Sequence, residues 1–175
     1  MSAPATSLAR DPAGTVSQHL AEWALGMSLD AVPVSVQVRA KHLILDALGI
    51  ALASTRFPFA EASLSGMREL GGPGNHQVYG YPDRLPLRDA VMMNGILVHG
   101  LDYDDTHVPG VIHATASAAP TVIAIAEQTK ATGADVLGAY IVAVEAASRI
   151  AAAARGGFHK VGFHPTGLVG IFGCV

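Results

Sequence analysis

One apolar segment constrains the fold more than any other feature of this sequence. Residues 135–154, DVLGAYIVAVEAASRIAAAA, are long enough for about five helical turns and are apolar on nearly every face. Glu145 and Arg149 interrupt the segment at i,i+4 spacing, where the two side chains can pair on one side of a helix. Two charges in its second half disfavour a membrane span. We therefore expect a central, buried helix and no membrane contact.

Several other segments repeat apolar residues at helical spacing, which predicts an all-α fold. The expected helices cover residues 16–29, 33–54, 58–70, 87–100, 114–133 and 134–154, followed by the first turns of another buried helix over 168–175. Ser117 or a neighbour could cap the helix over 114–133, and Pro120 would suit an early position in it. Residues 75–86, with room for one short extended piece, and the glycine-rich residues 155–167 are predicted as loops.

Composition excludes some classes of protein. Half of the 175 residues are apolar, the mean hydropathy is +0.37 and the net charge is -3 with no run of like charges, so a sizeable core is expected and a nucleic-acid partner is not. The one cysteine, Cys174, cannot form an internal disulfide and favours a reducing, cytoplasmic compartment. Residues 1–15 lack the apolar core of a secretory signal and are predicted to be a disordered tail.

Residues 16–175 are accordingly expected to form the helical domain. Its end, LVGIFGCV, has no cap, polar turn or terminal charge cluster. This pattern predicts a truncated, N-terminal portion of a longer protein. The alternative is a short helix that closes its own domain.

The stretch HGLDYDDTHVPGVIH, residues 99–113, concentrates three aspartates and three histidines in a chain of which only 14% is charged. All six are residue types that bind metals. Their spacing, however, matches neither the H-E-x-x-H pair nor an EF-hand loop, which needs a glycine and a terminal glutamate. We therefore expect no dedicated metal site.

Acid–base chemistry is the second interpretation. His113 and His164 each precede a predicted helix, whose free N–H groups favour a bound carboxylate and a neutral imidazole. Thr106 adds a hydroxyl, and Asp102 or Asp105 could orient an imidazole or hold a substrate hydroxyl. In the structural alternative, such histidines are caps or surface residues, and Asp104 and Asp105 are loop residues that accept backbone N–H groups. His99 would then only interact with a helix dipole.

Several motifs together resemble the MmgE/PrpD family. They are HGLDYDDTH with a following histidine, AAPTVIAIAE, LILDALGIALAS, and GFHPTG after a long alanine-rich helix. The resemblance runs from about residue 16 to the end and falls within the family's N-terminal helical domain. It implies a homodimer, an α/β C-terminal domain that this chain lacks, and proton movement next to a carboxylate of a small polycarboxylate, without metal or organic cofactor.

The resemblance also implies which residues act. The family's active-site aspartate falls on Asp102, its threonine on Thr106 and its two histidines on His113 and His164. Many relatives have His-Pro-Ser where this chain has His-Ala-Thr at 113–115, so the direction in which the His113 side chain points could differ. The family's catalytic lysines and a tyrosine fall beyond Val175.

We therefore expect part of a lyase, most like 2-methylcitrate dehydratase. Three alternatives stay open: a cis-aconitate decarboxylase-like activity, an epimerase or isomerase of the same family, and a non-catalytic truncated or split-enzyme module completed by a separate C-terminal chain. The chain alone is expected to be inactive.

Overall fold

A computed structural model of the chain describes residues 14–175, and the expectation for residues 1–13 of the tail lies outside this range. The described part is all-α apart from one small sheet, as predicted. Its elements are α1 (Val16–Gly26), the 3₁₀ turn η1 (Leu29–Ala31), α2 (Val34–Ser54), α3 (Pro58–Gly71), β1 (His76–Gln77), β2 (Arg84–Leu85), α4 (Leu87–His99), α5 (Ala114–Thr129), α6 (Gly133–Ala153), α7 (Gly157–Lys160) and α8 (Pro165–Gly173).

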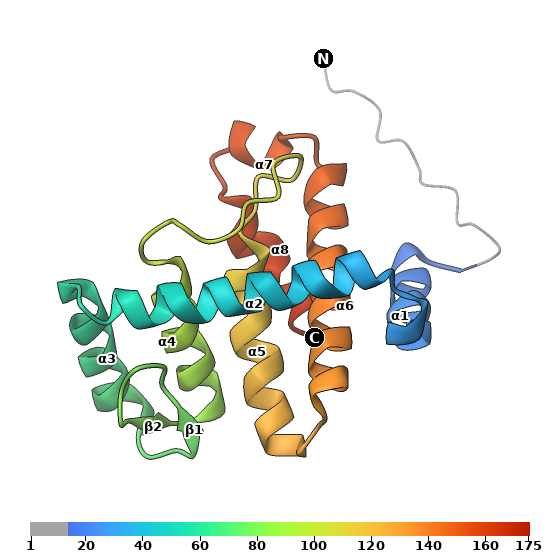
Figure 1. Cartoon of the computed structure of the whole chain (residues 1–175). Helices are drawn as coiled ribbons and strands as arrows, with labels where there is room; N and C mark the ends of the chain where they lie inside the picture. Colours follow the sequence, from blue (N-terminus) through green and yellow to red (C-terminus); the bar gives the residue numbers. More distant parts are fainter. Residues whose placement is uncertain (1–13) are drawn as a thin grey trace.

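Three helices, α4, α5 and α6, lie side by side and form the body of the domain (Figure 1). The long helix α2 crosses all three, and α8 packs against α5 and α6. At the other side of the body, α3 packs on α4 above the hairpin of β1 and β2, whose strands pair antiparallel through His76–Leu85 and Gln77–Arg84. The layered packing of α2 on α4, α5 and α6 gives the domain its core.

Two helices begin at capping boxes that can be read from the sequence. The Thr15 side chain accepts the Gln18 N–H at 3.2 Å, and the Gln18 side chain accepts the Thr15 N–H at 2.7 Å. Thr132 and Asp135 form the same reciprocal pair at the start of α6. Each pair satisfies backbone donors that the first helical turn leaves free.

The expected centre of the fold is α6. Eight of its residues are buried, among them Leu137 and Tyr140, and the Glu145–Arg149 ion pair forms on its exposed side as predicted. By length and composition α6 could also cross a membrane, but 44% of its apolar window is buried inside the domain. A core helix passes the same test, so the burial agrees with the expected packing role.

Several boundary predictions were wrong. The helix predicted over 16–29 ends at Gly26. The last helix begins at Pro165, directly after His164 as expected, and so includes part of the predicted loop. The predicted loop over 155–167 contains the one-turn helix α7, which glycines at both sides concealed. His113, not Ser117, is the N-cap of α5, so Pro120 lies in the buried helix interior, where it cannot donate to the carbonyl four residues earlier.

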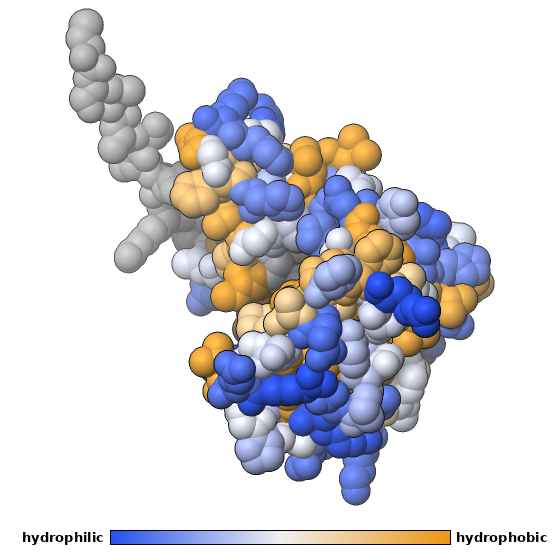
Figure 2. Space-filling view, turned by 90° about the vertical axis from the view of Figure 1, so that its left-hand side faces the viewer, coloured by the Kyte–Doolittle hydropathy of each residue, from blue (hydrophilic) through white to orange (hydrophobic). Residues whose placement is uncertain are grey.

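Large apolar side chains also remain exposed, including Leu45 and Leu52 of α2 and Ile171 and Phe172 of α8. Figure 2 shows that on one face of the molecule apolar patches alternate with polar ones. Scattered exposed apolar residues are normal for a folded protein. They identify no partner by themselves.

A buried hydrogen bond links the start of α5 to α6. The hydroxyls of Thr115 and Tyr140 lie 2.6 Å apart, and both residues are about 1% exposed. Burial raises the pKa of the Tyr140 phenol above its ordinary value.

We expect Tyr140→Phe to lower the free energy of unfolding by about 1–3 kcal/mol, because the Thr115 hydroxyl loses its buried partner. Urea unfolding at pH 7 measures the change. Tyr103→Phe is the control, since Tyr103 is 78% exposed, and it should stay within about 0.5 kcal/mol of the wild type. Equal effects of the two substitutions would contradict the role of the bond.

Candidate active site

Three helix ends bring three histidines together. His99 is the last residue of α4, His113 is the N-cap of α5 and His164 is the N-cap of α8. The ring centroids of His99 and His113 are 4.8 Å apart, and that of His164 lies 6.3 Å from His113 and 6.4 Å from His99. The structure thus brings together the two histidines selected from the sequence, and adds His99, which we had interpreted as a residue at a helix end.

The loop between α4 and α5, drawn in yellow-green in Figure 1, is fixed by close contacts within itself and to α6. Its two arms meet at an isolated antiparallel bridge between His107 and Ile112. Gly110 lies against α6 so closely that a Cβ there would come within 2.7 Å of the Ala151 side chain. Asp102 and Val111 adopt positive φ angles of 56° and 52°, which non-glycine residues rarely do. Such backbone strain persists only where the surrounding packing enforces it.

Asp104 is the most buried charged group of the loop. Both of its carboxylate oxygens lie 3.1 Å from Nδ1 of His99, and one lies 3.4 Å from Nδ1 of His113. The side chain is only 1% exposed. These contacts are with two imidazoles, so they do not fit the structural alternative in which Asp104 accepts backbone N–H groups.

Asp102 and Thr106 lie nearer to solvent. One Asp102 oxygen is 3.7 Å from Nε2 of His113, and the Asp102 side chain is 78% exposed. Thr106 is exposed on the same loop, and within the described residues its hydroxyl forms no hydrogen bond to the three histidines. The geometry thus connects Asp102 directly to His113, whereas the role of Thr106 stays a prediction.

Thr166, which we did not select from the sequence, joins α8 to α5. Its hydroxyl accepts the backbone N–H of His113 at 3.1 Å. This bond ties the first turn of α8, and so His164, to the N-cap of α5. No local pattern in the sequence indicated this bond, because the two residues lie 53 positions apart.

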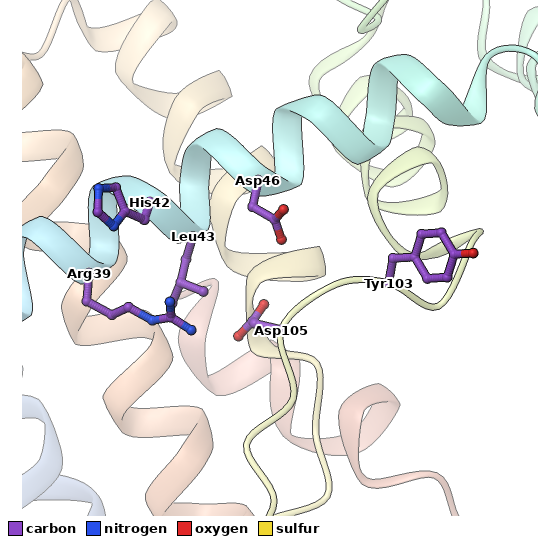
Figure 3. Close-up of a pocket in the computed structure, with 6 residues that line it drawn as sticks. All are labelled: Arg39, His42, Leu43, Asp46, Tyr103 and Asp105. Carbon is purple, nitrogen blue, oxygen red and sulfur yellow. The ribbon is translucent and has the colours of Figure 1, made fainter.

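Asp105 lines a pocket of about 410 Å³ between the loop and α2. Figure 3 shows the Arg39 guanidinium extending from α2 toward Asp105, with Asp46 nearby and the Tyr103 ring turned away. Asp105 accepts the Thr115 N–H at 3.3 Å, which confirms its interpretation as a loop residue that binds backbone. Burial raises the pKa of Asp105, although the bond from Thr115 partly opposes this shift.

The raised pKa predicts how stability depends on pH. The folded chain binds a proton on Asp105 more readily than the unfolded chain does, so ionised Asp105 costs stability at neutral pH. As the pH falls from 7 toward about 4, the ordinary range of an aspartate pKa, we expect the free energy of unfolding of the wild type to rise relative to that of Asp105→Asn. Urea unfolding of both proteins at several pH values measures this difference. If the difference in free energy of unfolding between the two proteins stays constant with pH, or changes in the opposite direction, the raised pKa of Asp105 is contradicted.

Metal binding has a geometric basis that the sequence spacing did not indicate. His99, Asp102, Asp104 and His113 each offer one ligand atom, and these atoms lie within 4.8 Å of one another. Imidazoles and carboxylates are donors that Zn²⁺ accepts. The same groups can also be satisfied by hydrogen bonds to one another, as the His99–Asp104 contact shows. The absence of a metal requirement therefore stays a prediction that needs its own measurement.

Comparison with known proteins identifies the family. The model of the MmgE/PrpD N-terminal domain matches residues 18–175. The chain belongs to the MmgE/PrpD family. It is 33% identical over 146 residues to a cis-aconitate decarboxylase of Aspergillus terreus, and the match covers 81% of this chain and 30% of the relative. It is 28% identical over 165 residues to the cis-aconitate decarboxylase of Homo sapiens, covering 91% of this chain and 34% of the relative.

The family match includes the loop over 99–113 and the start of α8, so the histidine cluster lies within the MmgE/PrpD N-terminal domain. The chain spans about a third of the length of the curated relatives that it matches. These relatives are named as decarboxylases, whereas the resemblance in the sequence had pointed first to 2-methylcitrate dehydratase.

Proposed function

We propose that this chain supplies the proton-transferring histidines of a lyase that acts on a small polycarboxylate, with decarboxylation of cis-aconitate as its reaction. The observation that carries the proposal is the convergence of His99, His113 and His164 at three helix ends beside the buried Asp104. The named relatives support decarboxylation over dehydration as the first reaction to test.

The arrangement suits a carboxylated substrate. The helices α5 and α8 begin at His113 and His164, so the partial positive charge of their N-termini lies beside the cluster. A substrate carboxylate would be stabilised there without an ion pair. His113 and His164, whose ring centroids lie 6.3 Å apart at this point, are the groups that would accept and return the proton.

Decarboxylation requires one proton from the protein. When the C–C bond to a carboxylate breaks, CO₂ leaves and the bonding electron pair stays on the remaining carbon skeleton. That pair must be protonated at carbon, and His113 or His164 would deliver the proton. Asp102, 3.7 Å from His113 Nε2, would position the substrate at the solvent side, and Thr106 would do the same from the adjoining part of the loop. A dehydratase could use the same residues, with one histidine removing an α-proton and another protonating the leaving hydroxyl.

From the family resemblance and the lone cysteine, we also propose that the protein works as a cytoplasmic homodimer. We further propose that it needs the cationic residues of a C-terminal region, supplied by the same gene or by a separate chain.

A substrate panel tests the proposed function. The complete gene product, meaning this chain with whatever coding sequence continues it, is incubated separately with cis-aconitate, 2-methylcitrate and a chiral dicarboxylate. We expect CO₂ release from cis-aconitate, at a rate unchanged by exhaustive chelation, and little or no turnover by the 175-residue chain alone. Dehydration of 2-methylcitrate without decarboxylation would replace the proposed reaction. If none of the three substrates is turned over, the result would favour the alternative in which the chain is a non-catalytic module.

A further inference from the structure

Asp104 has a geometry that its position in the sequence does not suggest. Its carboxylate is buried between two imidazoles and faces the same ring atom, Nδ1, of both His99 and His113. Nδ1 of His113 is buried, and it forms no hydrogen bond of standard geometry within residues 14–175. The nearest oppositely charged atom to it is the Asp104 oxygen at 3.4 Å.

The chemistry of an imidazole restricts which of its two ring nitrogens can carry the proton. A neutral imidazole carries its proton on one nitrogen and a lone pair on the other. If Nδ1 of either histidine were the bare nitrogen, its lone pair would face a carboxylate oxygen at hydrogen-bond distance, which is repulsive. Both rings should therefore carry the proton on Nδ1, which His99 donates to Asp104 and His113 directs toward it. A carboxylate can accept both, because each oxygen has two lone pairs.

We propose that Asp104 is the positioning residue of this site, and that it fixes His99 and His113 as Nδ1–H tautomers with their Nε2 lone pairs directed away from it. For His113, Nε2 lies 3.7 Å from an oxygen of Asp102, but the Asp102 side chain is 78% exposed and water can satisfy its carboxylate, whereas the buried Asp104 depends on the imidazoles. Asp104 thus orients the base and selects its reactive nitrogen without touching the substrate. The catalytic meaning of this arrangement rests on the function proposed above, but the tautomers themselves do not.

Nuclear magnetic resonance of the 175-residue chain tests the tautomers directly. Long-range ¹H–¹⁵N correlation spectra of histidine-labelled protein, recorded with chelator present, distinguish a protonated from a bare ring nitrogen. We expect protonated Nδ1 and bare Nε2 for both His99 and His113. A wild-type spectrum with the proton of His113 on Nε2 would overturn the proposal, and this measurement needs no variant.

Asp104→Asn supplies the second measurement. Asparagine replaces one acceptor oxygen with an NH₂ donor, so at least one of the two rings should change to the Nε2–H form, whose bare Nδ1 can accept from that NH₂. Asp46→Asn is the matched control, since Asp46 is exposed on α2 and outside the cluster, and it should leave both tautomers unchanged. Unchanged tautomers in a folded Asp104→Asn protein would overturn the proposal.

Activity separates a positioning role from a structural one. In the complete gene product, Asp104→Asn should lower kcat by about 10²-fold or more, because the wrong tautomer of a catalytic histidine can cost about 10⁴-fold. KM should change by less than about threefold, and Asp104→Glu, which keeps the carboxylate, should recover part of kcat. A change confined to KM would overturn the positioning role. If the tautomers are as expected but no polycarboxylate reacts, the proposed function fails and the assignment of Asp104 stands.

Discussion

Replacing His113 with asparagine in the complete gene product is expected to lower kcat by about 10²-fold or more, the usual contribution of a positioned acid or base. Asparagine keeps a polar side chain at the N-cap of α5, where it is a favoured residue, so the helix start should survive. The proton-transferring nitrogen, however, is lost. Steady-state kinetics with cis-aconitate would measure the change, and circular dichroism would confirm that the helices remain.

His42→Asn is the matched control for this experiment. His42 is exposed on α2, outside the three-histidine cluster, and kcat should stay within about twofold of the wild type. Near-normal kcat in the His113 variant would return His113 to the role of a helix cap. An equal loss in both variants would show that the effect is not specific to the cluster.

Truncating Leu64 to alanine is expected to lower the free energy of unfolding by about 2–5 kcal/mol. Leu64 is fully buried on α3 and packs in the cluster that joins this helix to α4 and the hairpin, with Met93 and Leu97 among its members. Removing the side chain loses apolar burial and leaves a cavity that this well-packed region can only partly close. Because α4 ends at His99, the loss would also loosen one support of the site.

Leu70→Ala on the same helix is the control for Leu64→Ala. Leu70 is 88% exposed, so its truncation should change the free energy of unfolding by less than about 0.5 kcal/mol. Denaturant unfolding of the two variants under identical conditions gives the comparison. Similar losses would mean that α3 does not pack through the face that carries Leu64.

The long helices were predictable from the sequence because their apolar residues recur every three to four positions over many turns. Their ends were less predictable where tertiary contacts decide them. Ser117 was a reasonable cap by local chemistry, but α5 extends back to Ala114, where Thr115 bonds to Tyr140 of α6 and Thr166 of α8 binds the His113 N–H. These partners lie far away in the sequence, so no local pattern shows them.

The two main histidines of the candidate site could be selected from the sequence, but the contacts among the residues of the site could not. His113 and His164 were identified because each precedes a helix, and the structure places their rings 6.3 Å apart. Asp104 could not be distinguished from Asp105 in the sequence DYDDT, because only the folded loop buries one between imidazoles and turns the other toward α2. The roles of Asp102 and Thr106, carried over from the family, stay predictions.

The most direct test of the central claim is a crystal structure of the complete gene product with tricarballylate, a saturated tricarboxylate that resembles the proposed substrate but lacks the double bond. The account predicts ligand density over the cluster, with a ligand atom within about 2.6–3.2 Å of His113 Nε2 and a carboxylate at the start of α5 or α8. Tricarballylate bound only in the pocket beside Arg39, or bound anywhere else with the histidine cluster vacant, would contradict it.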